Sequence, residues 1–112
     1  MSDSAMPFQR LDVYLAAKAM AECVHRARIS DDVLRDQARR ASKSAFLQVA
    51  EGLPNDSVPM RRKYFIYARN SACETSAAVD LAASLGCIGA DDAENIARLA
   101  KSIAMMLRAM IR

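Results

Sequence analysis

The sequence has few of the residues that interrupt helices and few that build catalytic sites. It contains no tryptophan, only three glycines and three prolines, and one histidine among 112 residues. Alanine is the most frequent residue, and it favours helix because it loses no side-chain entropy there. No apolar run approaches the roughly 20 residues that a helix needs to cross a bilayer. We therefore expect a helical protein that does not enter a membrane.

Cysteine is also scarce, and its spacing is uninformative for metal or disulfide sites. Cys23, Cys73 and Cys87 are odd in number and widely separated, which argues against a disulfide framework and favours a reducing compartment. The opening segment MSDSAMPFQR has no apolar stretch of the kind found in signal peptides. These features predict a cytoplasmic protein. A chain of this length predicts one domain, residues 1–112, with residues 1–7 frayed.

Apolar residues recur at three- and four-residue steps in four segments, and no useful stretch alternates with period two. We expect helices at about 9–28, 32–51, 58–85 and 92–111. Short loops between them favour an all-α, up-down-up-down four-helix bundle. The expected inward faces are Leu11, Tyr14, Ala17, Ala21 and Val24 in the first helix; Leu34, Ala38, Ala41, Ala45 and Val49 in the second; Phe65, Ala68, Ala72, Ser76, Val79 and Ala83 in the third; and Ile96, Leu99, Ile103, Met106 and Met110 in the fourth.

Residues with capping propensity stand at the expected helix ends. Ser30, Asp31 and Ser57 offer oxygens to the first-turn amides of the second and third helices. Gly52 and Gly86 can adopt the left-handed conformation that ends a helix. Asp91 and Glu94 have the spacing of a capping box for the fourth helix.

Two segments in the middle of the chain resemble a known family. LRDQARRASKSAFLQVAEG, residues 34–52, resembles the second-helix signature of four-helix-bundle proteins encoded by intervening sequences of bacterial 23S ribosomal RNA genes. FIYARNSACET, residues 65–75, is similar to the third-helix pattern of those proteins, and LAASLGCI, residues 81–88, resembles their Leu-Gly helix end. The chain departs from the family at Gln48, where asparagine is usual, and at Asn70, where glycine is common.

The resemblance implies an assembly and a set of partners. It implies a homo-oligomeric ring, with a pentamer favoured, and a relation to the accessory variability proteins of diversity-generating retroelements. Those are basic pentameric barrels that bind nucleic acid and a reverse transcriptase. The physiological role of most members is unassigned, so the resemblance predicts fold and assembly better than activity.

Positive charge is concentrated in one part of the chain. Residues 39–69 contain seven basic and two acidic residues, although the whole chain has a net charge of only +3. We predict that the seven basic residues form a band on the second and third helices that binds nucleic acid, with RNA or another single strand favoured. Tyr64 and Tyr67 could stack on unpaired bases. The predicted binding residues are Arg39, Arg40, Lys43, Arg61, Arg62, Lys63 and Arg69.

Two alternatives accompany this prediction. Charged faces on bundle helices are commonly just solvated, and the tyrosines would then pack against a neighbouring helix. Otherwise the protein is an interaction scaffold whose basic face meets an acidic partner, with no nucleic-acid ligand. The third helix is apolar around much of its circumference, because Ala77, Ala78 and Ala82 lie beside its inward stripe. A helix of this kind needs a second partner, and with Met105 this supports an oligomer.

Sites for metal or catalysis are not predicted. Glu22 and His25 have a spacing used by di-iron bundles, but one histidine cannot complete such a site. No phosphate-binding glycine pattern or serine elbow occurs. Glu51 is either a buried carboxylate or, as we favour, a structural partner for a polar group such as an arginine of the third helix. We expect a non-enzymatic protein without a cofactor.

Overall fold

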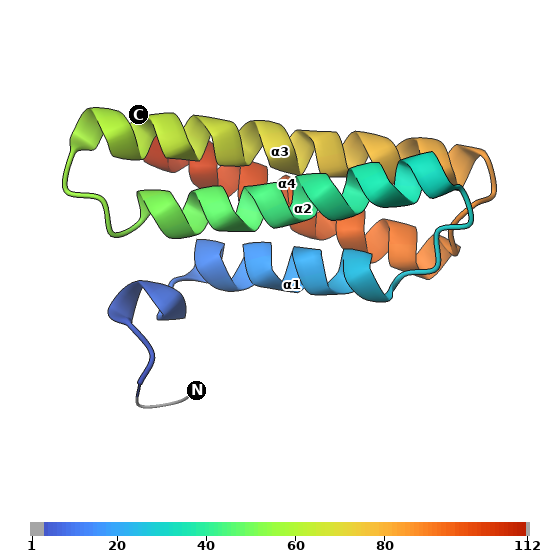
Figure 1. The fold of residues 1–112 in the computed structure, drawn as a ribbon, viewed down its shortest axis with the longest axis horizontal. Coiled ribbons are helices and arrows are strands. Elements are labelled where there is room, and N and C mark those ends of the chain that lie inside the picture. Colours follow the sequence, from blue (N-terminus) through green and yellow to red (C-terminus); the bar gives the residue numbers. More distant parts are fainter. Residues whose placement is uncertain (1–3, 112) are drawn as a thin grey trace.

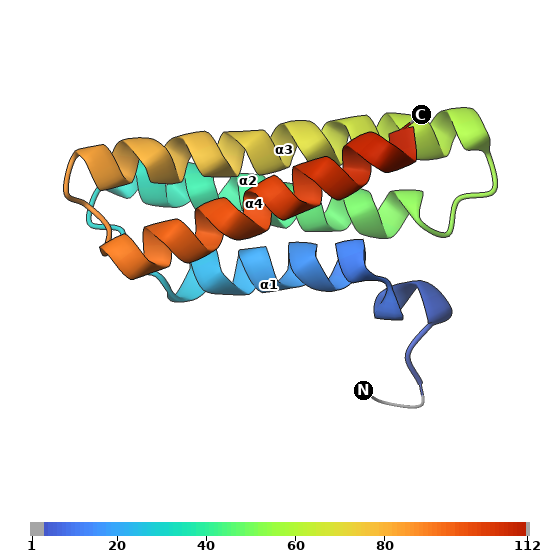
Figure 2. The ribbon, with the colours of Figure 1, turned by 180° about the vertical axis from the view of Figure 1, so that it is seen from behind.

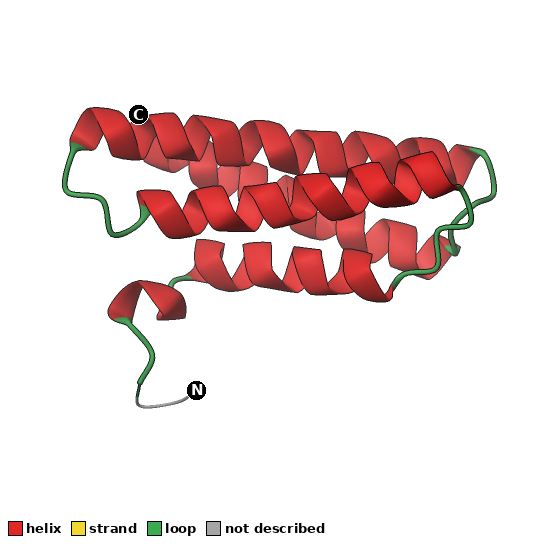
Figure 3. Cartoon of the chain, viewed as in Figure 1, coloured by secondary structure: helices red, strands yellow, loops and turns green. Residues whose placement is uncertain are grey.

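The computed structural model describes residues 4–111, which form a four-helix bundle and no strand (Figure 3). The helices are α1 (Asp12–Arg26), α2 (Asp32–Gly52), α3 (Val58–Ser84) and α4 (Ala90–Ile111), preceded by a short 3-10 helix, η1 (Pro7–Arg10). Successive helices run in opposite directions (Figure 1). The predicted fold class and the up-down-up-down order are therefore confirmed.

Each helix packs against the next one in the chain, and α4 closes the circle against α1. Figure 1 shows α2 between α3 and α1, and Figure 2 shows α4 crossing between α3 and α1 on the opposite side. The interface between α2 and α3 is the most extensive. As a result, α3 has α2 on one flank and α4 on the other, and its third side faces outward.

The core is built from large apolar side chains set among alanines. Phe65, Met20, Ile96, Ile103 and Leu107 are its largest fully buried side chains. Several alanines, including Ala17, Ala38, Ala45, Ala68 and Ala72, are completely buried. A methyl group allows two helix backbones to approach closely, so these alanines determine how tightly the bundle closes.

The predicted inward faces are correct for much of α2 and α3 and shifted in α1 and α4. Leu11 precedes α1 and is 47% exposed, whereas Met20, which we did not place inward, is completely buried. In α3, Ser76 is half-buried and Ala83 is exposed. In α4, Met110 is 39% exposed. The face of α4 that enters the core consists of Ile96, Ala100, Ile103, Leu107 and Ile111. The reason is that apolar residues cover a wide part of the circumference of α4. Because α4 packs against both α1 and α3, only the residues in the middle of this apolar part are buried.

Helix bounds agree with prediction for α2 and α3 and differ for the other two. The predicted range 9–28 was too long, because η1 is a separate turn and Ala27 is already extended (φ −66°, ψ 140°). Helix α4 begins at Ala90, so Asp91 lies inside its first turn and the predicted capping box is wrong. Of the residues expected to fray, 1–3 lie outside the described range.

Side-chain caps and one glycine stop are confirmed. An Asp31 Oδ1 accepts a hydrogen bond from the Leu34 amide at 2.9 Å, and Ser57 Oγ accepts one from the Met60 amide at 3.4 Å. Gly86 has φ +72°, and the amides of Gly86 and Cys87 donate to the carbonyls of Ala83 and Ala82. This pair of bonds is the Schellman motif, which requires a left-handed residue after the helix.

Gly52 ends its helix in a different way from the one predicted. Gly86 is the only described glycine with a positive φ, so Gly52 is not left-handed. It is buried in the last turn of α2, where an added Cβ would lie 2.7 Å from Phe65 Cε1 and 3.1 Å from Tyr64 Cβ. Gly52 is thus required for the close approach of α2 to α3.

Candidate nucleic-acid interface

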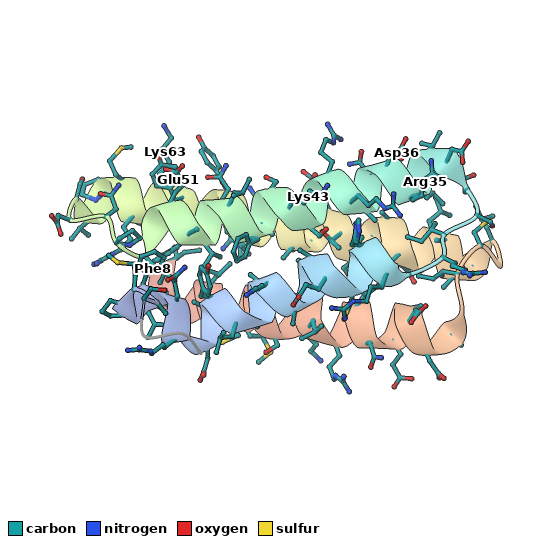
Figure 4. The ribbon with its side chains drawn as sticks, turned by 60° about the horizontal axis from the view of Figure 1, so that its bottom comes forward. Phe8, Arg35, Asp36, Lys43, Glu51 and Lys63 are labelled. Atoms are coloured by element: carbon teal, nitrogen blue, oxygen red, sulfur yellow. The ribbon has the colours of Figure 1, made fainter. Side chains whose placement is uncertain are left out.

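The seven basic residues predicted to form one band differ in their exposure and in the elements that they contact. Arg40, Lys43 and Lys63 are exposed on α2 and α3. Figure 4 shows Lys63 and Glu51 projecting at the end where α2 stops and α3 starts, and Lys43 nearer the middle of α2. Arg39 and Arg62 bond to carbonyl oxygens of other helices, and Arg61 and Arg69 are half-buried, so α2 and α3 alone do not carry a continuous exposed band.

Two of the predicted binding residues hold the ends of other helices. Arg39 donates from its guanidinium to the carbonyl oxygen of His25 at 3.4 Å, in the last turn of α1. Arg62 donates from Nε to the carbonyl oxygen of Ile111 at 3.1 Å, at the end of α4. The last carbonyls of a helix lack partners within it and carry partial negative charge, so a cation there is stabilising. The positions of Arg39 and Arg62 therefore have a structural explanation.

Arg61 and Arg69 are both half-buried, and they lie in different places. Arg61 is in the first turn of α3. Arg69 is four residues before Cys73 and seven before Ser76, so it shares their side of α3. Cys73 and Ser76 line a groove between α3 and α4. Arg69 therefore lies on the α4 side of α3.

Two further cations, which sequence reasoning missed, lie on the facing side of α4. Lys101 and Arg108 are exposed and seven residues apart, so they share a face of the helix. Lys101 is one turn after Ala97, which lines the same α3–α4 groove. The antiparallel packing of α3 and α4 brings this face beside Arg62 and Arg69. The seven-residue spacing of these two residues in the sequence indicates that they share a helix face. Only the packing of α4 against α3 shows that this face lies beside Arg62 and Arg69.

We use the name basic surface for the exposed side of the first half of α3 together with its flanks on α2 and α4. Tyr67 lies on its α2 side, because it is one turn before Ser71 and two turns before Glu74, which line the groove between α2 and α3. Tyr67 is 45% exposed and has Lys63 Nζ 5.8 Å above its ring. Tyr64, in contrast, is half-buried against the end of α2. Only one of the two predicted stacking tyrosines is therefore accessible. The basic surface comprises Arg40, Lys43, Arg62, Lys63, Arg69, Lys101 and Arg108.

Charge is segregated along the α3–α4 pair. Residues 57–73 and 95–111 carry seven cations and no carboxylate, whereas residues 74–94 carry five carboxylates and no cation. Because α3 and α4 are antiparallel, the two cationic segments lie together at one end of the bundle and the anionic segments lie at the other. The bond between Arg62 and Ile111 joins the two cationic segments.

The cations of the basic surface have no carboxylate partners among residues 4–111. The ion pairs in this part of the chain join Glu22 with Arg26 on α1, and Arg35 with Asp32 and Asp36 at the start of α2. Figure 4 shows Arg35 and Asp36 at the far end from Lys63. Glu51 is exposed and its carboxylate makes no hydrogen bond or ion pair with another described residue, so its predicted structural pairing is wrong.

Grooves run between neighbouring helices of the described range. The groove between α3 and α4 has a volume of about 510 Å³, and one between α1 and α4 of about 310 Å³ is lined by apolar residues such as Met106 and Met110. A third, of about 350 Å³, lies between α2 and α3 and is lined mainly by polar side chains. Near it, the Gln48 Oε1 atom is buried without a hydrogen-bond partner.

The arrangement of titratable groups offers no metal centre within the described range. Residues 4–111 hold no group of three or more His, Cys, Asp or Glu side chains that could bind an ion. Glu22 is paired with Arg26 at 3.5 Å, and His25 is exposed beside them. None of the helices in this range combines the length and apolar character needed to span a bilayer.

Comparison with known proteins agrees with the fold and establishes the family. None of the curated proteins matches the chain. The chain is similar to a protein of unknown function from the S23 ribosomal protein family of Bacteroides thetaiotaomicron VPI-5482, solved by crystallography at 1.70 Å resolution. The two share 18% sequence identity with a TM-score of 0.80, and the match covers 89% of this chain and 98% of the other. The model of the family described as 23S rRNA-intervening sequence protein matches residues 9–109. With nearly its whole length matched, the chain belongs to the 23S rRNA-intervening sequence protein family.

Proposed function

We propose that this chain is a non-enzymatic, cytoplasmic binding module that assembles with copies of itself and binds RNA along the basic surface. The observation that supports RNA binding is the segregation of charge along α3 and α4, with seven cations and no carboxylate in residues 57–73 and 95–111. Cations that pair with no protein carboxylate are available to phosphates, and each phosphate that they neutralise releases counterions.

The shape of the basic surface favours a single strand. Its cations flank the outward side of one helix, and Tyr67 lies among them with part of its ring accessible. A basic track with an aromatic side chain is the usual way to hold an unpaired strand, since every base can stack on a ring. The relation to retroelement accessory proteins that the resemblance implies remains part of this proposal.

Assembly is supported by apolar side chains that the single chain leaves exposed. Val33, Leu47, Leu85 and Met105 are each more than half exposed. Leu11, Met106 and Met110 also line one apolar groove between α1 and α4, and a contiguous exposed apolar patch is typical of an interface. The alanine argument is weaker than predicted, because Ala78 and Ala82 are buried within the chain. We favour a pentameric ring on the family resemblance, and a ring would place several copies of the basic surface around one axis.

A salt titration tests the RNA proposal. We expect single-stranded RNA to bind at low salt in a filter-binding assay, with affinity falling as salt rises. Lys63 and Lys101 are exposed on α3 and α4. Replacing both with glutamate should flatten the slope of log affinity against log salt by about 1.4, because each contact to a single strand contributes about 0.7.

The matched control is the pair Lys18→Glu and Arg28→Glu. Both residues are exposed, in α1 and in the loop that follows it, and the pair changes the net charge by the same amount. We expect this control to keep most of the slope. The proposal fails if no RNA binds at low salt, or if the control weakens binding as much as the test pair does.

Light scattering tests the assembly. A chain of 12.3 kDa that assembles into a ring gives a particle of several times this mass at micromolar concentration. A stable particle of 12.3 kDa under these conditions would refute the proposal. The measurement also determines whether the number of copies is five.

The alternative function is a protein-interaction scaffold whose basic surface meets an acidic partner. One observation favours it: Leu47, between Lys43 and Glu51 on the outer side of α2, is 58% exposed, and an apolar side chain offers nothing to a phosphate. Titration with polyglutamate at the same salt concentrations separates the two functions. Polyglutamate that binds as tightly as RNA would support the scaffold.

A further inference from the structure

The polar pocket between α2 and α3 lies beside the basic surface, at the boundary between the cationic and anionic parts of α3. Its volume of about 350 Å³ falls within the range of small-molecule sites, about 300–1,000 Å³. It is lined by Gln37, Arg40, Ala41 and Ser44 of α2 and by Ser71 and Glu74 of α3. Tyr67 is one helical turn before Ser71, so a strand stacked on Tyr67 passes the mouth of the pocket.

Contacts inside the pocket leave a carboxylate free. The hydroxyl groups of Ser44 and Ser71 are hydrogen-bonded to each other across the two helices at 3.0 Å. The Arg40 guanidinium donates to the side-chain oxygen of Gln37. Glu74 is exposed and its carboxylate makes no hydrogen bond or ion pair with any residue in the range 4–111, although Arg40 lines the same pocket. A free acceptor and a guanidinium with unused donors therefore face one cavity.

This combination of groups does not fit a phosphate. A phosphate in the pocket would lie near the Glu74 carboxylate, and two anions at short range repel each other. It fits a neutral ligand that donates on one side and accepts on the other. Unpaired bases bound by proteins are read in this way, through their Watson–Crick and Hoogsteen edges.

Guanine is the RNA base with the matching edge. Its N1–H and N2–H groups are adjacent donors that can both bond one carboxylate, and its O6 and N7 atoms accept from a guanidinium. Adenine and cytosine present one donor beside an acceptor, and uracil presents one donor between two acceptors. We propose that the pocket receives one unpaired guanine of the bound RNA, with Glu74 bonding N1–H and N2–H and Arg40 bonding O6 or N7. This inference rests on the RNA binding proposed above.

Competition between designed oligonucleotides tests the inference. Oligouridine with a single central guanosine is compared with the same strand carrying adenosine or inosine at that position, by fluorescence anisotropy at low salt. We expect guanosine to bind about tenfold more tightly than adenosine, which is about 1.4 kcal/mol, because guanine can make the bidentate contact to Glu74 and adenine cannot. Inosine, which lacks the 2-amino group, should fall between them.

Glu74→Gln and Asp80→Asn form the matched pair of variants. Each removes one exposed negative charge from α3, and Asp80 lies on the α4 side, outside the pocket. We expect Glu74→Gln to abolish the guanosine preference while the affinity for plain oligouridine stays the same or rises, and Asp80→Asn to retain the preference. Equal binding of guanosine and adenosine, or a preference that survives Glu74→Gln, would overturn the inference while RNA binding stands. Failure of every strand to bind would overturn both proposals.

Discussion

The two ends of the α3–α4 pair share their packing and differ in their surfaces. Buried residues follow both helices without a break, from Phe65 to Ala82 and from Ile96 to Ile111. Surface charge instead changes sign at one boundary, after Cys73 on α3 and after Glu94 on α4. Packing does not require this change, because exposed positions of a bundle helix accept either sign. The helix dipole accounts for part of the change, since Asp91 and Asp92 lie in the first turn of α4 and Arg108 lies in its last turn. Lys63 and Arg69 on α3 have no such explanation, and they belong to the surface that we propose binds RNA.

The two ends also differ in how closely the backbones approach. At the basic end, Gly52 lies against Phe65 and has no room for a side chain. At the acidic end, Gly89 has no atom within 4 Å of the position that a Cβ would take. Replacing each glycine with alanine tests this difference. If the close approach at Gly52 does not matter for stability, the two variants will be equally stable.

The largest effect on stability is expected from Gly52→Ala. The added methyl would lie 2.7 Å from Phe65, which is only 2% exposed and cannot move aside. Overpacking of this kind costs about 1–3 kcal/mol in the free energy of unfolding. Urea denaturation measures it. Gly89→Ala is the control, with a change below about 1 kcal/mol, and equal losses in the two variants would contradict our account of Gly52.

The charge contrast can be tested from its acidic end. Asp80 and Glu94 line the α3–α4 groove. Replacing both with lysine extends the basic surface, and we expect RNA affinity at low salt to rise about tenfold through two added phosphate contacts. The control is Asp12→Lys with Glu22→Lys on α1, which changes the net charge equally. A rise of the same size in the control would show that total charge, and not its placement, governs binding.

Gly86→Ala measures the cost of backbone strain at the acidic end without any contribution from side-chain crowding. No atom lies within 4 Å of the added methyl, but φ is +72°, where residues with a side chain are disfavoured. We expect a loss of about 1 kcal/mol. Thermal unfolding of Gly86→Ala, with Gly89→Ala as the control, measures this loss as a lower melting temperature. An unchanged melting temperature of Gly86→Ala would contradict the strain argument.

Effects equal to or smaller than that of Gly86→Ala are expected from the helix caps, which stand at opposite ends of the bundle. Asp31→Ala removes a bond of 2.9 Å and should cost about 1 kcal/mol. Ser57→Ala removes a longer bond of 3.4 Å and should cost about 0.5 kcal/mol. Chemical denaturation of both variants gives the order, and a larger loss for Ser57→Ala would reverse the comparison.

Local signals predicted the middle of the chain well. Asp31, Ser57 and Gly86 mark helix ends by hydrogen bonds within a few residues, so the sequence alone was sufficient for α2 and α3. The core side of α4 needed knowledge of two neighbouring helices, because Leu99 and Met106 are as apolar as the buried Ala100 and Leu107. Gly52 was predicted to stop a helix and instead fits a partner 13 residues away in sequence, which no local rule anticipates.

The candidate site was predicted in part for the same reason. Basic residues are recognisable in the sequence, but their use depends on what the chain brings near them. Arg39 and Arg62 contact carbonyl oxygens of α1 and α4, 14 and 49 residues away. Lys101 and Arg108 reach the basic surface only because α4 returns antiparallel to α3. The cationic segments 57–73 and 95–111 are far apart in the sequence, and the antiparallel packing of α3 and α4 brings them to the same end of the bundle.

One bond at the acidic end reports on the folding of the whole bundle. The Ser30 amide, in the loop between α1 and α2, donates to the carbonyl oxygen of Cys87, in the loop between α3 and α4, at 2.9 Å. This bond joins the hairpin of the first two helices to the hairpin of the last two. Hydrogen exchange at this amide therefore requires the hairpins to separate or the loops to open locally. If its protection equals that of amides inside α2 and α3, the hairpins separate only when the helices unfold, and weaker protection shows that the contact between the loops opens first.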